Sequence, residues 1–234
     1  MRLRFVYPFL LFISLLPLVS LRAQDITSIV QQTRLKLEKV NDYEAKGRMK
    51  TNVTFLKVPV ATVKIYFKKP NRLKLKSEKG VSFIPKGAVS INLNNMLKES
   101  DFTIIDAGED RMDGVPVRIA KLLPNDDNSD VVLSTLYIDP VAFLVRKAKT
   151  TTRENGSYEL EMKYGKYAEY GLPDKIVFSF NTKDYKVPKG ITFDYDDGTR
   201  KESQQNPVKD KKGRVEIDYL DYQINKGVPD SVFQ

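Results

Sequence analysis

The chain has 234 residues, a formal net charge of +9 at pH 7, no cysteine and no histidine. Without cysteine the fold has no disulfide, and without histidine it has no Ser-His-Asp or Cys-His mechanism and no histidine ligand for catalytic zinc. Any catalysis would have to use carboxylates, lysine or tyrosine, so the composition argues against an enzyme.

Residues 1–24 have the three parts of a secretory signal peptide. Residues 1–4 are basic, residues 5–21 are apolar, and Ala23 and Gln24 offer small-residue cleavage. An uncleaved anchor helix is the alternative, but the apolar run is only about 17 residues long and contains two prolines. We therefore predict an exported protein whose signal peptide is removed.

The remaining chain, residues 25–234, is moderately basic and reads as one domain. Removing Arg2, Arg4 and Arg22 with the signal peptide lowers the net charge from +9 to +6. The lysines are spread along expected strand faces, whereas a nucleic-acid groove concentrates its charge. We predict no nucleic-acid partner, and a broad, weak attraction to anionic membrane surfaces.

One amphipathic helix is expected at residues 25–40. Its apolar stripe has spacings of three and four residues, and consists of Ile26, Ile29, Val30, Thr33, Leu37 and Val40. Asp25 or Thr27 can cap its beginning, and Asn41-Asp42 can end it. We expect this helix to pack on a sheet; binding to a membrane is the alternative.

Residues 63–76 read as a two-faced hairpin. Val63, Ile65 and Phe67 alternate with polar or charged residues, and Leu73 and Leu75 do the same after a turn at residues 69–71. Similar patterns predict about eleven strands, at 43–57, 58–69, 72–78, 102–107, 115–123, 131–138, 143–152, 157–166, 175–181, 191–195 and 214–224. Residues 88–100 are irregular and could hold a short helix.

Turn signals separate the later strands. Residues 109–114 end in Asp113-Gly114, and Asn155-Gly156 is typical of a tight hairpin. Strands at this spacing predict a mainly β fold, an antiparallel sandwich or barrel.

Three groups of acidic residues are candidate metal-binding or catalytic sites. Residues 194–198 faintly match a calcium loop, but Gln205 stands where the pattern needs glutamate, and residues 125–130 read as a solvated loop. Glu159 and Glu161 could form a carboxylate pair, but they alternate with apolar residues as solvent-facing side chains do. We predict no metal site, no cofactor and no catalytic residue.

The shared apolar face of the strands is either an ordinary core or the wall of a cavity. It is rich in adaptable side chains, and a single strong helix is available to cover it, which favours a cavity. The candidate lining residues are the apolar members of clear strands: Val63, Ile65, Phe67, Leu73, Leu75, Phe83, Leu160, Met162, Ile176 and Phe178.

Short motifs in a fixed order add a family resemblance. They are LEKVNDY at 37–43, FKKPNRL at 67–73, DFTIIDAG at 101–108, Asp113-Gly114, YIDP at 137–140, Asn155-Gly156 and Tyr164. In this order and spacing the chain resembles the LolA-like family, the periplasmic lipoprotein carriers of Gram-negative bacteria. The resemblance covers nearly all of residues 25–234.

The resemblance implies an incomplete, strongly bent antiparallel barrel of about eleven strands, with helices as a lid. It also implies a monomer in the periplasm whose cavity holds the acyl chains of lipoproteins. Cargo would come from an inner-membrane lipoprotein-releasing transporter and pass to an outer-membrane acceptor. A lipid-sensing or scaffold module of the same fold, acting in envelope stress, is the alternative.

Lys69 departs from the family pattern. The family carries an arginine just before the proline of this turn, and that arginine latches the lid. A lysine is a point donor and lacks the forked geometry of a guanidinium. We therefore expect the latch at Lys69 or, alternatively, at Arg72. The tryptophans frequent in such cavities are also absent.

Overall fold

The computed structural model describes residues 25–53, 56–57, 60–79, 102–154, 156–181 and 212–234. The predicted signal peptide, Phe83, the expected short helix in 88–100 and the predicted strand at 191–195 lie outside these residues. The elements in chain order are α1 (Ile26–Leu37), β1 (Asp42–Val53), β2 (Leu56–Lys57), β3 (Ala61–Lys68), β4 (Arg72–Lys79), β5 (Phe102–Met112), β6 (Val115–Pro124), β7 (Val131–Asp139), β8 (Leu144–Thr152), β9 (Gly156–Lys163), η2 (Ala168–Tyr170), β10 (Lys175–Asn181), β11 (Lys212–Ile224) and η3 (Asp230–Phe233).

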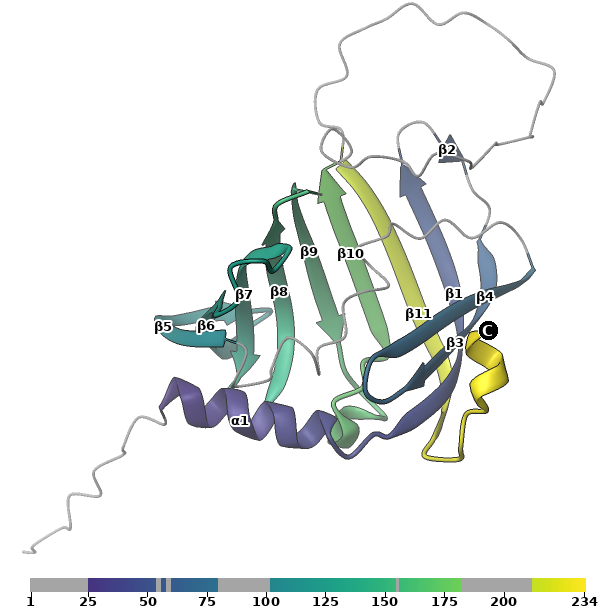
Figure 1. Cartoon of the computed structure of the whole chain (residues 1–234), viewed down its shortest axis with the longest axis horizontal. Coiled ribbons are helices and arrows are strands. Elements are labelled where there is room, and N and C mark those ends of the chain that lie inside the picture. The colour runs from purple at the N-terminus through teal and green to yellow at the C-terminus, as the bar shows by residue number, and fades with distance from the viewer. Residues whose placement is uncertain (1–24, 54–55, 58–59, 80–101, 155, 182–211) are drawn as a thin grey trace, which may run out of the picture.

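All eleven strands belong to one antiparallel sheet. Ten follow the order β4-β3-β1-β11-β10-β9-β8-β7-β6-β5, and β2 pairs with β1. In the described part of the chain, the terminal strands β4 and β5 do not pair with each other, so the strongly curved sheet stays open (Figure 1). This confirms the predicted mainly β fold, an incomplete antiparallel barrel with an N-terminal helix.

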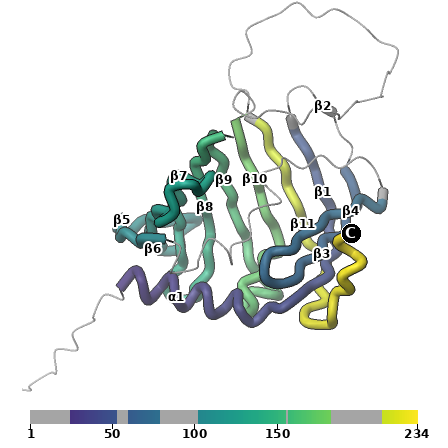
Figure 2. Tube along the Cα trace, viewed as in Figure 1, coloured from purple at the N-terminus to yellow at the C-terminus, as the bar shows by residue number. Residues whose placement is uncertain are grey.

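The pairing of β1 with β11 brings the two ends of the described chain together. Tyr43 lies opposite Ile224, and Thr51 lies opposite Val215. In Figure 2 the yellow β11 accordingly runs between β1 and β10. This contact joins the β3–β4 hairpin to the β9–β10 pair in a single continuous surface.

Helix α1 runs across the ends of the strands, from β5 and β6 to η2 (Figure 1). The predicted apolar stripe is buried, and α1 ends at Leu37 with Glu38 as its C-cap, before the predicted end at Val40. Asp25 occupies the N-cap position, but its side chain makes no capping hydrogen bond. Burial of the stripe therefore positions α1, and most helices in proteins gain their stability in this way.

The structure corrects the expected loop at 109–114. Strand β5 continues to Met112, and only Asp113-Gly114 turn the chain. A register shift between Asp106 and Glu109, with Gly108 at a φ of 91°, lets the strand bend and still continue its pairing with β6. The short helices η2 and η3 were not predicted, because three or four residues show no helical periodicity.

Candidate functional site

The sheet has an apolar face and a charged face, as strand β3 shows most clearly. Ala61, Val63, Ile65 and Phe67 are buried, whereas the residues between them are partly exposed. Residues directly opposite each other in an antiparallel pair point to the same side, so the register extends this face across the sheet. We call it the inner face, because α1 contributes to the same apolar cluster.

Nine of the ten predicted lining residues lie on the inner face, and the tenth, Phe83, is outside the described residues. They form two groups. On β3 and β4, Ile65 lies opposite Leu75 and Phe67 opposite Leu73, and Val63 belongs to the same row on β3. On β9 and β10, the pairs are Met162 with Ile176 and Leu160 with Phe178.

Strands β1 and β11 connect these two groups. Ala45 lies opposite Ile65, and Met49 lies opposite Ile217. Ile217 in turn lies opposite Ile176, which belongs to the second group. Ala45 and Met49 lie on the same side of β1, so this strand joins the two groups along its own length, and apolar residues extend over the inner face from β4 to β9. Neither Met49 nor Ile217 was assigned to this face from the sequence.

The lining residues differ in burial. Val63, Ile65, Phe67, Leu160, Met162 and Phe178 are all buried. Leu73, Leu75 and Ile176 are half-buried and pack against the buried cluster. The buried members act as core, and each contributes about 1.5–3 kcal/mol by leaving water. The half-buried members leave apolar surface exposed on the same face.

An aromatic cluster closes the inner face near the end of α1. Tyr222 is its centre and stacks on Tyr219 at 4.9 Å, with Tyr43 and Tyr167 edge-on at 5.3 and 4.9 Å. The Tyr222 hydroxyl donates to the Pro173 carbonyl oxygen at 2.8 Å. Burial raises the pKa of Tyr219 to about 12, so this phenol stays neutral at physiological pH. The sequence shows no sign of this cluster, because it joins β1, η2 and β11.

The two predicted latch residues point to different partners. Lys69 Nζ donates to the Glu38 carbonyl oxygen at 2.6 Å and to Asn41 Oδ1 at 3.2 Å, at the end of α1. Arg72 pairs with Asp230 at 3.0 Å and lies over the ring of Phe233, both in η3. Lys69 thus contacts the helix, whereas Arg72 holds the C-terminal segment.

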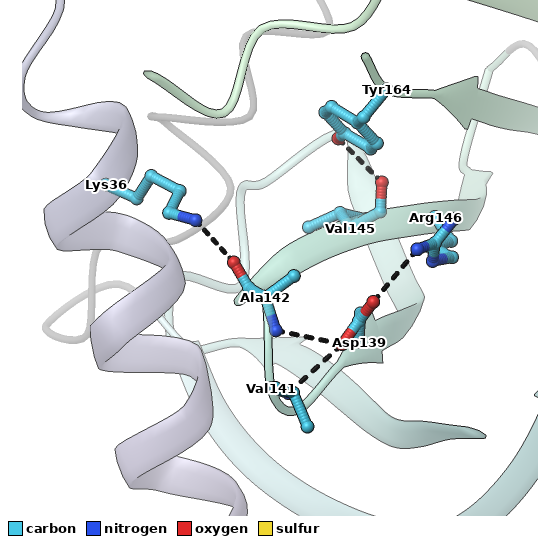
Figure 3. A network of polar contacts seen from close by, with 7 residues as sticks. All are labelled: Lys36, Asp139, Val141, Ala142, Val145, Arg146 and Tyr164. Atoms are coloured by element: carbon cyan, nitrogen blue, oxygen red, sulfur yellow. Dashed lines mark hydrogen bonds and ion pairs between the residues drawn. The ribbon is translucent and has the colours of Figure 1, made fainter. Parts of the chain in front are cut away.

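A second lysine joins α1 to the sheet at the β7–β8 turn (Figure 3). Lys36 Nζ donates to the carbonyl oxygen of Ala142. The buried carboxylate of Asp139 shapes that turn, accepting hydrogen bonds from the Val141 and Ala142 backbone N–H groups and pairing with Arg146 at 2.9 Å. Burial lowers the pKa of Lys36, and the neighbouring Lys39 adds to this.

Asp139 is held as a carboxylate at this turn. Burial alone raises its pKa, but the hydrogen bonds from Ala142, Arg146 and Val141 together outweigh burial. The pKa of Asp139 therefore lies below its ordinary value, because three donors favour the charged form. The ionised side chain holds the turn that receives Lys36.

The opposite face of the sheet carries paired charges. Lys64 pairs with Glu44 at 3.0 Å, and Lys175 pairs with Glu216 at 2.7 Å. Glu159, considered above as half of a carboxylate pair, is 2.6 Å from Lys147. Among the described residues, no group of three or more acidic side chains is arranged to hold a metal ion. None of the described helices is long and apolar enough to cross a membrane.

Comparison with solved structures identifies the fold. A domain from Vibrio parahaemolyticus, described as an outer membrane lipoprotein-sorting protein, aligns with a TM-score of 0.57 and 11% identity over 89% of this chain and 95% of that chain. This chain has the LolA-like fold. A DUF1329 family protein from Desulfovibrio piger aligns with a TM-score of 0.54 and 12% identity, over 90% of this chain and 98% of that chain.

At these identities the likeness concerns the fold alone. No protein-family model matches the sequence, and no curated protein matches it either. The LolA-like fold was predicted from short motifs in a fixed order, and the structural alignment over most of both chains confirms it.

Proposed function

We propose that this protein is a periplasmic carrier that binds the acyl chains of lipoproteins, or of a related lipid, against its inner face. The observation that carries the proposal is the inner face, whose apolar residues extend from β4 to β9 on a sheet whose terminal strands do not pair within the described residues. The lipoprotein-sorting domain that shares the fold supports the choice of cargo.

Such binding needs no covalent chemistry. Each acyl CH₂ group kept out of water contributes about 0.8 kcal/mol, so a long chain provides enough free energy to offset its removal from a membrane. Half-buried Leu73, Leu75 and Ile176 offer contact surface beside the buried cluster. The charged residues that alternate with the apolar ones along each strand face solvent on the other side of the sheet.

Helix α1 is the element that we propose to move when cargo enters. Within the described residues, polar contacts join it to the sheet side at two points, through Lys36 to Ala142 and through the Glu38 carbonyl to Lys69. Each contact is a hydrogen bond to a backbone carbonyl, which is worth about 1–3 kcal/mol when the donor is charged. Cargo could replace contacts of this size.

We further propose that the monomer receives cargo from an inner-membrane transporter and passes it to an outer-membrane acceptor. Mass spectrometry under native conditions, on protein purified from the periplasm, tests the first step, and we expect a co-purifying acyl ligand. Absence of any such ligand, together with no uptake of a fluorescent fatty acid, would contradict the proposal. Binding without transfer to acceptor membranes would instead indicate a sensor of the same fold.

A pair of substitutions locates the binding face. Leu75→Gln places a polar side chain on the inner face of β4, whereas Lys76→Gln changes the neighbouring residue on the outer face. We expect the first to weaken fatty-acid binding roughly fivefold, because about 1 kcal/mol of apolar contact is lost, and the second to leave it unchanged. Equal effects of the two substitutions would mean that the inner face is not the site.

A further inference from the structure

Hydroxyl groups interrupt the apolar inner face at the end remote from α1. Thr51 on β1 lies opposite Val215, which itself lies opposite Phe178. Across the sheet, Thr150 on β8 lies opposite Ser134 on β7 and Tyr158 on β9. We call Thr51, Ser134, Thr150 and Tyr158 the hydroxyl rim.

Thr51 is a buried hydroxyl without a partner. Its side chain is only 5% exposed, and its Oγ1 atom has no hydrogen-bond partner among the described residues. A buried polar group without a partner destabilises a fold, and valine would fill the same space without that cost. Among the described residues nothing bonds to this hydroxyl, which points to a ligand.

The other three hydroxyls lie side by side at the same end of the inner face. Ser134 Oγ and Thr150 Oγ1 are 3.0 Å apart and fully buried, and Tyr158 lies opposite Thr150 on β9. A hydroxyl can donate one hydrogen bond and accept two, so this group can also bond to an oxygen of a ligand.

Aromatic rings occupy the inner face between the two parts of the rim. The ring centroid of Phe178 is 5.5 Å from that of Tyr158 and 5.3 Å from that of Phe180. Near α1, by contrast, the phenol hydroxyls bond to the protein itself, as Tyr222 does with Pro173 and Tyr164 with Val145. Within the described part of the chain, the Thr51 hydroxyl is thus the unpartnered side-chain hydroxyl of the inner face, and it lies at the end remote from α1.

We infer that the hydroxyl rim binds the ester or carboxyl oxygens of a lipid whose hydrocarbon chain runs along the inner face toward α1. The inference rests on the proposed lipid-binding function and adds the orientation and headgroup chemistry of the ligand. From Leu144, at the β7–β8 turn that Lys36 contacts, to Thr150, strand β8 spans about 20 Å at 3.3 Å per residue. One leaflet of a bilayer core is about 15 Å thick, so an acyl chain fits along this span.

Displacement of a fluorescent fatty acid by dodecanoic acid, methyl dodecanoate and dodecane tests the inference with the full-length protein after export. In the Thr51→Val variant we expect affinity for the acid and the ester to fall at least roughly fivefold, because the hydrogen bond from the Thr51 hydroxyl is lost, and affinity for dodecane to stay unchanged, because dodecane accepts no hydrogen bond. Thr51→Ser retains a hydroxyl and should restore much of the affinity. Both variants should fold, since Thr51→Val removes an unpartnered group.

Thr151→Val is the matched control. Thr151 Oγ1 and Ser157 Oγ form a similar pair, 2.9 Å apart, but on the other side of β8 and β9, where Thr151 is half-buried and Ser157 exposed. This variant should change no affinity. Tighter binding of the acid than of the ester would identify a free fatty acid as the ligand, and the reverse order would identify an ester-linked lipid.

Two results would overturn the inference. Thr51→Val could weaken the binding of dodecane as much as the binding of the ester, or it could leave all three affinities unchanged. Either result would mean that the hydroxyl does not bind the headgroup. Failure of the unsubstituted protein to bind any of the three probes would be a different result. It would overturn the proposed function itself.

Discussion

Lys69 donates a hydrogen bond of 2.6 Å to the carbonyl oxygen of Glu38, the residue that caps the C-terminal end of α1. The last carbonyls of a helix lack partners within the helix and carry the negative end of its dipole, so a cation there is favourable. From the sequence we expected the latch at Lys69 or, alternatively, at Arg72, because the LolA-like family that the chain resembles carries an arginine at the position of Lys69. The structure shows that a point donor can reach the helix end.

Replacing Lys69 should change the closure of α1. Lys69→Ala should lower the free energy that holds the C-terminal end of α1 in place by about 0.5–1 kcal/mol. Release of bound fatty acid should therefore become about two- to fivefold faster. Lys69→Arg should slow release: Lys69 donates to the Glu38 carbonyl and Asn41 Oδ1 from a single nitrogen, whereas a guanidinium offers several N–H donors in a rigid fork, so less side-chain freedom is lost per hydrogen bond. Stopped-flow release and hydrogen exchange of residues 26–37 measure the two effects.

Lys121→Ala removes the same charge from an exposed position on β6 and serves as the control. It should leave both quantities unchanged. No effect of Lys69→Ala and Lys69→Arg on either measurement would mean that the latch is not at Lys69.

Arg72 should act on the C-terminal segment and not on α1. Its partners Asp230 and Phe233 belong to η3, and Lys68 also pairs with Asp230. Arg72→Ala should speed hydrogen exchange of residues 230–234 and leave exchange of α1 unchanged. If α1 loosened instead, Arg72 would be the latch that the sequence allowed as the alternative.

Lys36→Met should loosen α1 at the β7–β8 turn. Methionine keeps the apolar stem of lysine but cannot donate to the Ala142 carbonyl oxygen. We expect a loss of about 1 kcal/mol in helix attachment and faster exchange of the α1 amides. Lys39→Met, which alters an exposed lysine just beyond α1, should have a smaller effect, and equal effects would argue against the Lys36 contact.

Asp139→Asn should make stability depend less on pH in the acid range. Because the pKa of Asp139 is lowered in the folded protein, its carboxylate stabilises the fold fully above the unfolded pKa of about 3.9. That stability is lost as the pH falls through the folded pKa. At pH 7 we expect the variant to be less stable by about 1–3 kcal/mol, since a buried charged acceptor is lost.

Denaturant unfolding at pH 7 and at successively lower pH checks this prediction. The difference between Asp139→Asn and the unsubstituted protein should shrink as the pH falls below about 4. Asp127→Asn, in an exposed loop, is the control and should show little difference at any pH. A difference that stays constant down to low pH would contradict the assigned role of the carboxylate.

Part of the site was predictable because strand alternation is local. Val63, Ile65 and Phe67 are two residues apart, so any strand that includes them puts them on one side. The β10 pattern of Ile176 and Phe178 was recognised in the same way, and both lie on the inner face. Thr51 and the Tyr222 cluster were missed, because nothing in their local sequence says which partners they meet.

The sequence by itself determined which side chains share a strand face, where the chain turns, and that α1 has one apolar stripe. These features depend on neighbours within a few residues. Only the tertiary structure decided that β11 lies between β1 and β10, which joins two groups of lining residues from distant parts of the chain. It also decided that Lys69 contacts Glu38 and that Arg72 contacts Asp230, because the fold determines which groups lie within reach of a long, flexible side chain.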